Sequence, residues 1–216
     1  MAKSASVATV VFPRDNDALE RLDHRAVPRN PLDLFDGWIA DARDHGAGEA
    51  TYVTLATSSP EGVPSSRTVQ LLAVEEDALV FTTNADSRKG REMTATGRAA
   101  VSVYWEQTSR SVNVTGVVAW ADDDESDALF AAEDRGVQAS RTVSFHGEPL
   151  RDEAEQLTRF RALLASGEPI ARPAHWRWFR IVPDAVTFWE AVPEALNLRV
   201  HYRRDGRDWT SQAVQS

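Results

Sequence analysis

Short runs of alternating apolar and polar residues are the main pattern of this chain, and they predict β-strands. In the run 111–120, Val112 and Val114 alternate with polar residues, so one face is predicted to be buried and the other to be wet or to face a ligand. A short acidic break joins 67–74 to 78–84, which predicts two adjacent antiparallel strands. Strand-like runs occur at 52–57, 67–74, 78–84, 99–105, 111–120, 178–181, 185–189, 199–203 and 209–213.

Helical spacing of apolar residues marks the segments between these strands. A first helix is predicted to begin with Asn30 as its cap and Pro31 in its first turn. Further helices are predicted at about 87–95 and at 152–166. The acidic stretch 122–127 favours a helix start at the positive end of the helix dipole over a metal site, because no histidine lies near it in sequence.

This order of elements predicts a mainly β (α+β) fold. Crossover helices do not alternate with the strands, which disfavours a doubly wound parallel sheet. A small antiparallel barrel with helices packed around it fits better. Residues 1–29, with scattered charges, are interpreted as an N-terminal arm, and residues 30–216 as the barrel domain.

Composition restricts the function classes. The chain has 24 Lys and Arg against 33 Asp and Glu, a formal net charge of −9, which argues against binding to nucleic acid or to an anionic membrane. It has no cysteine, which excludes disulfides and thiolate chemistry. No apolar run reaches about 18 residues and no leader pattern is seen, so a cytoplasmic protein is expected.

An anionic ligand of an acidic protein needs a local group of cations. Arg67, Arg88 and Lys89 form such a group, and Ser87 stands where a helix should begin. Hydroxyls, helix N–H groups and Arg or Lys side chains together suit a phosphate monoester. The alternative is that Ser87 merely caps a surface helix and the cations are solvated.

The sequence has no motif for the common metal-dependent, nucleotide-binding or esterase chemistries. The chain has no glycine-rich nucleotide loop, no His-Glu-x-x-His and no Gly-x-Ser-x-Gly, and its five histidines do not pair at ligand spacing, so no metal site is expected. A bound organic cofactor would then perform the chemistry. Flavin mononucleotide (FMN) suits the cations and hydroxyls, and a cation near its ring would stabilise the reduced form.

Three stretches, 67–72, 80–84 and 87–90, resemble in order the pyridoxamine 5′-phosphate oxidase superfamily of FMN-binding split barrels. Weaker matches extend the resemblance over about 31–209. The resemblance implies a homodimer with flavin at the subunit interface. It also implies that FMN is bound by Arg67, Thr68, Val69, Gln70, Thr82, Thr83, Ser87, Arg88, Lys89, Ser111, Trp189 and Arg199. Ser111 stands where the superfamily usually has a glutamine, and Trp189 and Arg199 are expected from the second subunit.

The substrate side departs from a pyridoxamine-phosphate oxidase. Leu72 replaces a lysine, Leu129 a tyrosine, Glu133 an arginine and Val137 a serine, while Asn197 falls in an altered Arg-Leu-His segment. Losing these polar ligands should cost several kcal/mol with a phosphorylated substrate, since each charge-assisted hydrogen bond contributes roughly 1.5–3 kcal/mol. The segments 103–109 and 171–173 are instead similar to the phenazine-biosynthesis flavin oxidases.

We therefore expect an FMN-dependent oxidase of secondary metabolism. It would dehydrogenate a small reduced aromatic or heteroaromatic substrate, with O₂ as final acceptor giving H₂O₂. Three alternatives remain: a pyridoxine/pyridoxamine 5′-phosphate oxidase, a flavin- or deazaflavin-dependent reductase, and a non-catalytic flavin-binding module. His146 and Asn197 are weak candidates for a general base; for each, a structural or substrate-orienting role is favoured over that of a base.

Overall fold

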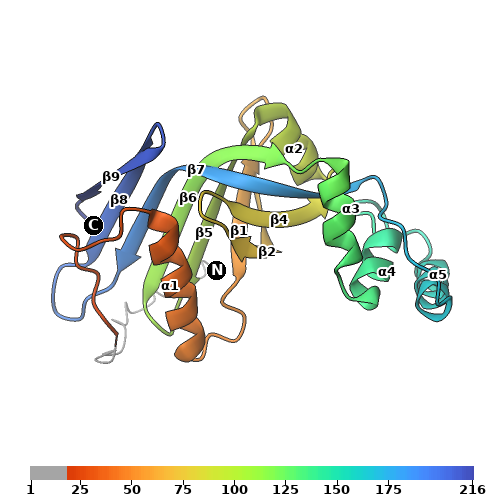
Figure 1. Cartoon of the computed structure of the whole chain (residues 1–216), viewed down its shortest axis with the longest axis horizontal. Helices are drawn as coiled ribbons and strands as arrows, with labels where there is room; N and C mark the ends of the chain where they lie inside the picture. The colour runs from red at the N-terminus through yellow and green to blue at the C-terminus, as the bar shows by residue number, and fades with distance from the viewer. Residues whose placement is uncertain (1–18) are drawn as a thin grey trace, which may run out of the picture.

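A single antiparallel sheet, curled into a split barrel, is the centre of the fold (Figure 1). The computed structural model describes residues 19–216. The strands run in the order β2-β1-β5-β6-β7-β4-β3, with β8 on β7 and β9 on β8. Their bounds are β1 Tyr52–Ser58, β2 Pro64–Gln70, β3 Ala73–Val74, β4 Leu79–Asn84, β5 Arg98–Trp105, β6 Arg110–Trp120, β7 Trp176–Glu190, β8 Leu198–Asp205 and β9 Asp208–Ala213.

Strand β7 links the two halves of the sheet. Its first part, Trp176 to Ile181, pairs with β4, and its last part, Ala185 to Glu190, pairs with β8. The sequence predicted two short strands here, but the chain continues through Pro183, which pairs with Gly116, and a bulge in β7 leaves Asp184 unpaired in the register. A bulge bends a strand without ending its pairing, which explains why one strand serves both halves.

The predicted antiparallel pairing of 67–74 with 78–84 is confirmed only for residues 73–74 and is wrong for the rest of the run. Strand β2 pairs along its whole length with β1, and only the short β3 pairs with β4. The exchange of partners occurs at two residues: the Leu71 N–H donates to the Thr51 carbonyl, and the Leu72 N–H donates to the Val80 carbonyl. The run is therefore broken by tertiary pairing, which alternation along the chain does not reveal.

Five helices accompany the sheet in the described part of the chain. Helix α1 begins at the predicted Asn30 cap and buries Phe35 and Ile39 in the main core. The predicted acidic helix start is confirmed, because the Asp122 carboxylate caps α3 through the Glu125 N–H. Helix α4 was not predicted. The bounds are α1 Pro31–Asp44, α2 Arg88–Thr96, α3 Asp123–Ala131, α4 Arg135–Val143 and α5 Glu153–Ala165.

Helices α3, α4 and α5 gather at one end of the molecule, away from β8 and β9 (Figure 1). Helix α5 buries none of its residues, and Leu157 and Leu164 are exposed. Residues 1–18 of the predicted arm lie outside the described residues. In the described remainder, Leu22 is buried and its N–H donates to the Glu190 carboxylate. The division into arm and barrel domain stays a prediction. No described helix is long and apolar enough to span a membrane.

Candidate functional site

A cavity of about 490 Å³ opens where β2, β4, the start of α2 and α4 meet. It brings together residues that are far apart in sequence. Leu72 and Val137, from the predicted substrate side, also line it, together with Tyr52 and Trp176, which were not predicted. The predicted cofactor residues on its wall are Thr68, Val69, Gln70, Thr82, Thr83 and Lys89.

The hydroxyl and amine at the start of α2 are held locally. Ser87 caps the helix: its Oγ accepts from the Gly90 N–H at 3.4 Å and donates to the Asn84 carbonyl at 2.7 Å. Lys89 Nζ donates to the same Oγ at 3.2 Å. Burial, and then the charge of Arg67, lower the pKa of Lys89 to about 8. The amine is therefore charged at neutral pH but poorly solvated, which favours an anionic partner.

Arg67 and Arg88 converge on a buried carboxylate, Glu92, that the sequence analysis missed. Arg88 Nε donates to Glu92 at 2.8 Å, and Arg67 lies at 3.7 Å from it. Thr57 and Ser65 also donate to Glu92, at 2.5 and 2.6 Å. The two arginines are thus held in place by a protein partner. The i, i+4 spacing of Arg88 and Glu92 was the available signal.

The ionisation of Glu92 reflects this network. Burial alone raises the pKa of the carboxyl, but hydrogen bonds from Ser65, Thr57 and Arg88 outweigh it and lower the pKa to about 2. The carboxylate is therefore charged at neutral pH. It fixes Arg67, which also donates to the Leu55 carbonyl at 3.2 Å, beside the cavity wall.

Arg141 is a second cation of the cavity wall that sequence reasoning missed. It comes from α4, the helix that was not predicted, whose nine residues include only three apolar ones, Val137, Ala139 and Val143. Its guanidinium pairs with Glu133 and lies over the rings of Trp176 and Trp178. Glu133, predicted on the substrate side, therefore stands behind Arg141, while Leu129 packs at the edge of a small core cluster on α3.

Ser111, Trp189 and Arg199 do not reach this cavity within one chain. They form a cross-strand row on β6, β7 and β8, with Ser111 opposite Trp189 and Trp189 opposite Arg199. The adjacent row, Val112, Phe188 and Val200, is fully buried, so the three predicted residues lie on the outer face of the sheet.

The two weak candidates for a general base, His146 and Asn197, lie in different places. His146 lines the cavity, and burial, followed by the charges of Lys89, His175 and Arg141, lowers its pKa. It is therefore a neutral group at neutral pH. Asn197 lies in the loop before β8, where its side-chain oxygen accepts from the Val192 N–H at 3.2 Å, and it does not line the cavity.

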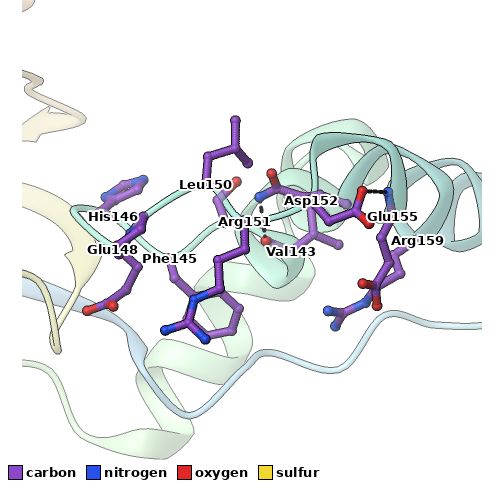
Figure 2. Close-up of a pocket in the computed structure, with 12 residues that line it drawn as sticks. Val143, Phe145, His146, Glu148, Leu150, Arg151, Asp152, Glu155 and Arg159 are labelled. Carbon is purple, nitrogen blue, oxygen red and sulfur yellow. Dashed lines mark hydrogen bonds between the residues drawn. The ribbon is translucent and has the colours of Figure 1, made fainter.

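A second cavity, of about 530 Å³, adjoins the first beside the loop that joins α4 to α5 (Figure 2). Only Ser144 and His146 line both. Its wall is mixed in charge, with Arg151 and Arg159 as well as Glu148 and Glu155, and Figure 2 shows Asp152 turned back to cap α5. None of its other residues was predicted as part of a site.

Comparison with known proteins supports the assignment of the fold. Residues 47–190 match the family model described as pyridoxamine 5′-phosphate oxidase. The pyridoxine/pyridoxamine 5′-phosphate oxidase of Paraburkholderia xenovorans is 37% identical over 199 residues, which cover 91% of this chain and 93% of that protein. The enzyme so named in Gluconobacter oxydans is 35% identical, covering 83% and 91%.

Among solved structures, PhzG from Burkholderia lata, in complex with tetrahydrophenazine-1-carboxylic acid, superposes with a TM-score of 0.87 at 29% identity. The superposition covers 92% of this chain and 98% of PhzG. An FMN-binding protein from Nostoc punctiforme, with a TM-score of 0.71 at 22% identity, shares the fold. Both the extent of the family match and the identity over most of the chain lead to one conclusion: this chain belongs to the pyridoxamine 5′-phosphate oxidase family.

Proposed function

We propose that this chain is an FMN-dependent oxidase that dehydrogenates a small reduced aromatic or heteroaromatic compound, with O₂ as the final acceptor. The observation that carries the proposal is the cavity where β2, β4 and the start of α2 meet. It combines the Thr82 and Thr83 hydroxyls with the ammonium of Lys89, beside a helix N-terminus. These groups suit a phosphate monoester.

The residues present fit FMN. Lys89 is half-buried and has only the Ser87 hydroxyl as hydrogen-bond partner among the described residues, so it has donors left for a phosphate. Thr68 to Gln70 on β2 provide a wall for a flat ring. When bound, FMN would supply the acceptor for a hydride of the substrate, which carries two electrons, while the substrate also loses a proton; O₂ would then take up the two electrons and two protons as H₂O₂.

The chain itself would bind, orient and exclude water. Arg67, held by Glu92, would place a fixed positive charge near the cofactor. His146 has a lowered pKa and stays neutral, so it is able to accept a proton from a bound substrate without first losing one. We propose this role for His146 and propose none for Asn197, whose side chain is engaged in its own loop.

We also propose a homodimer in which the outer sheet face of each subunit meets the other. The supporting observation is the row of Ser111, Trp189 and Arg199 on that face, since residues predicted for the flavin would otherwise be remote from the cavity. Tyr104, opposite Ser111, is 57% exposed in the single chain. Exposed aromatic side chains of this kind are enriched in protein interfaces.

The substrate preference rests on the cavity wall. Leu72 and Val137 are apolar where a phosphate-recognising oxidase would have polar ligands, and they suit the body of a ring system. PhzG, whose structure holds a tetrahydrophenazine carboxylic acid, supports this preference. The second candidate, pyridoxine/pyridoxamine 5′-phosphate oxidation, is favoured by the names of the curated relatives.

Turnover under air separates the two candidates. The purified, FMN-loaded protein should consume O₂ and release H₂O₂ with a tetrahydrophenazine carboxylic acid, and should convert pyridoxamine 5′-phosphate at least about tenfold more slowly, since one lost charge-assisted contact weakens binding by that factor. Heat-denatured protein with free FMN is the control for spontaneous oxidation. Equal or faster formation of pyridoxal 5′-phosphate would make the vitamin B6 reaction the function.

A further inference from the structure

The guanidinium of Arg141 is held in a rigid frame at the cavity wall. Its centre lies 4.7 Å from the Trp176 ring and 5.4 Å from the Trp178 ring. Its Nη1 pairs with the Glu133 carboxylate and lies 3.5 Å from Thr82 Oγ1. Two aromatic faces and one carboxylate thus restrict the side chain, which lowers the entropy that it would lose on binding a ligand.

One edge of this guanidinium has no protein partner. Within residues 19–216, the hydrogen bonds and ion pair of Arg141 all use Nη1, and Nε and Nη2 are neither bonded nor buried. Nε–H and Nη2–H form the side-on fork that matches the two oxygens of a carboxylate. The same protein uses this edge at Arg180, whose Nε and Nη2 bind Glu75 at 2.7 and 3.0 Å.

The charge of the frame also favours an incoming anion. Burial raises the pKa of Glu133 to about 7, although the charge of Arg141 opposes this rise, and Glu133 Oε2 has no hydrogen-bond partner. The carboxylate is therefore only partly ionised near neutral pH and compensates the arginine incompletely. The other cation on the cavity wall, Lys89, lies with the hydroxyls that suit a phosphate.

We propose that Arg141 is a specificity-determining residue that binds a carboxylate of the substrate through Nε and Nη2, while Glu133, Trp176 and Trp178 position it. This inference deepens the proposed function, on which it rests. The apolar neighbours on the wall, Val137 and Leu72, would contact the ring system that carries the carboxylate. The ligand class is a flat aromatic carboxylic acid.

The test uses FMN-loaded protein and two probes of the same shape, naphthalene-2-carboxylate and naphthalene-2-carboxamide. Binding is followed by the change that each probe causes in the visible spectrum of the flavin. Wild type should bind the carboxylate more tightly than the carboxamide. Arg141→Gln should lower the affinity for the carboxylate about tenfold or more and change the affinity for the carboxamide little, because only the anion uses the charge-assisted fork. Arg141→Lys, which keeps the charge but loses the fork, should be intermediate.

Control variants and probes distinguish carboxylate binding by Arg141 from a general effect of charge and from a role in FMN or phosphate binding. Arg161→Gln, an exposed arginine on α5, removes the same charge outside the cavity and should change neither affinity. Loss of FMN affinity in Arg141→Gln, an equal loss for both probes, or tighter binding of naphthyl phosphate than of the carboxylate would overturn the assignment. A wild-type protein that takes up no FMN would contradict the proposed function instead, whereas FMN uptake without carboxylate preference would contradict the role of Arg141 alone.

Discussion

The double variant Arg88→Ala/Lys89→Ala should bind FMN more weakly by about 3 kcal/mol or more, because two charge-assisted contacts to the phosphate are lost. This corresponds to roughly a 150-fold rise in Kd, since each 1.4 kcal/mol is about a factor of ten. Lys89 should account for most of the loss, because its amine lies on the cavity wall with a pKa lowered to about 8. Arg88 is shared with Glu92 and its side chain is 59% exposed.

Quenching of FMN fluorescence on titration with protein measures this affinity. The matched control is Arg91→Ala, which removes an exposed cation from the same helix; Arg91 donates to the Asp86 carbonyl and does not line the cavity. The control should bind FMN as wild type does. If the double variant also kept wild-type affinity, these side chains would be solvated and the phosphate would be bound elsewhere.

The second large effect is expected on stability. Glu92→Gln should lower the free energy of unfolding at neutral pH by about 3 kcal/mol, the order found when one partner of a buried ion pair is removed. Glu92 is 6% exposed, and its loss as a carboxylate leaves Arg67, with a side chain 22% exposed, without its counter-charge. Denaturant unfolding monitored by tryptophan fluorescence measures the difference.

The pH dependence of this effect has a definite sign. The folded pKa of Glu92 is lowered to about 2 from 4.5, so its contribution is fully present above pH 4.5 and is lost as the pH falls towards 2. The difference in the free energy of unfolding between wild type and Glu92→Gln should therefore decrease as the pH falls from 5 to about 2–3, where Glu92 of the wild type also begins to be protonated. Glu49→Gln, an exposed site, should show no gap. A gap that stays constant with pH would mean that packing, and not charge, is what Glu92 contributes.

Local signals predicted much of this fold. Asn30 and Ser87 act as helix caps in the structure because capping depends only on a side chain and the next turn. The alternation around Val112 and Val114 gives the buried face of β6 for a similar reason. The prediction that failed depends on residues far apart in sequence. At Leu71 and Leu72 the hydrogen-bonding partner of the chain changes from the β1 side to β4, and no local pattern encodes that change.

The residues of the candidate site show the same contrast between local and distant signals. Thr82, Thr83 and Lys89 were predicted from a compact stretch, and the structure places them on one cavity wall. Arg141 was missed because α4 is only nine residues long, is mostly polar and has no side-chain cap hydrogen bond to mark its start. Trp189 and Arg199 were predicted for the same site, yet one chain places them on the outer sheet face. The role proposed for them would need a partner subunit, which sequence patterns alone do not position.

The central claim is that two copies of this chain enclose FMN. Size-exclusion chromatography with light scattering, with visible absorbance recorded on the same peak, tests it most directly, followed by acid precipitation and identification of the released flavin. The account predicts a yellow species with twice the mass of one chain that releases FMN and not FAD, and that is more stable with FMN than without it, because only the folded state binds the cofactor. A colourless protein that takes up no added FMN would contradict the account.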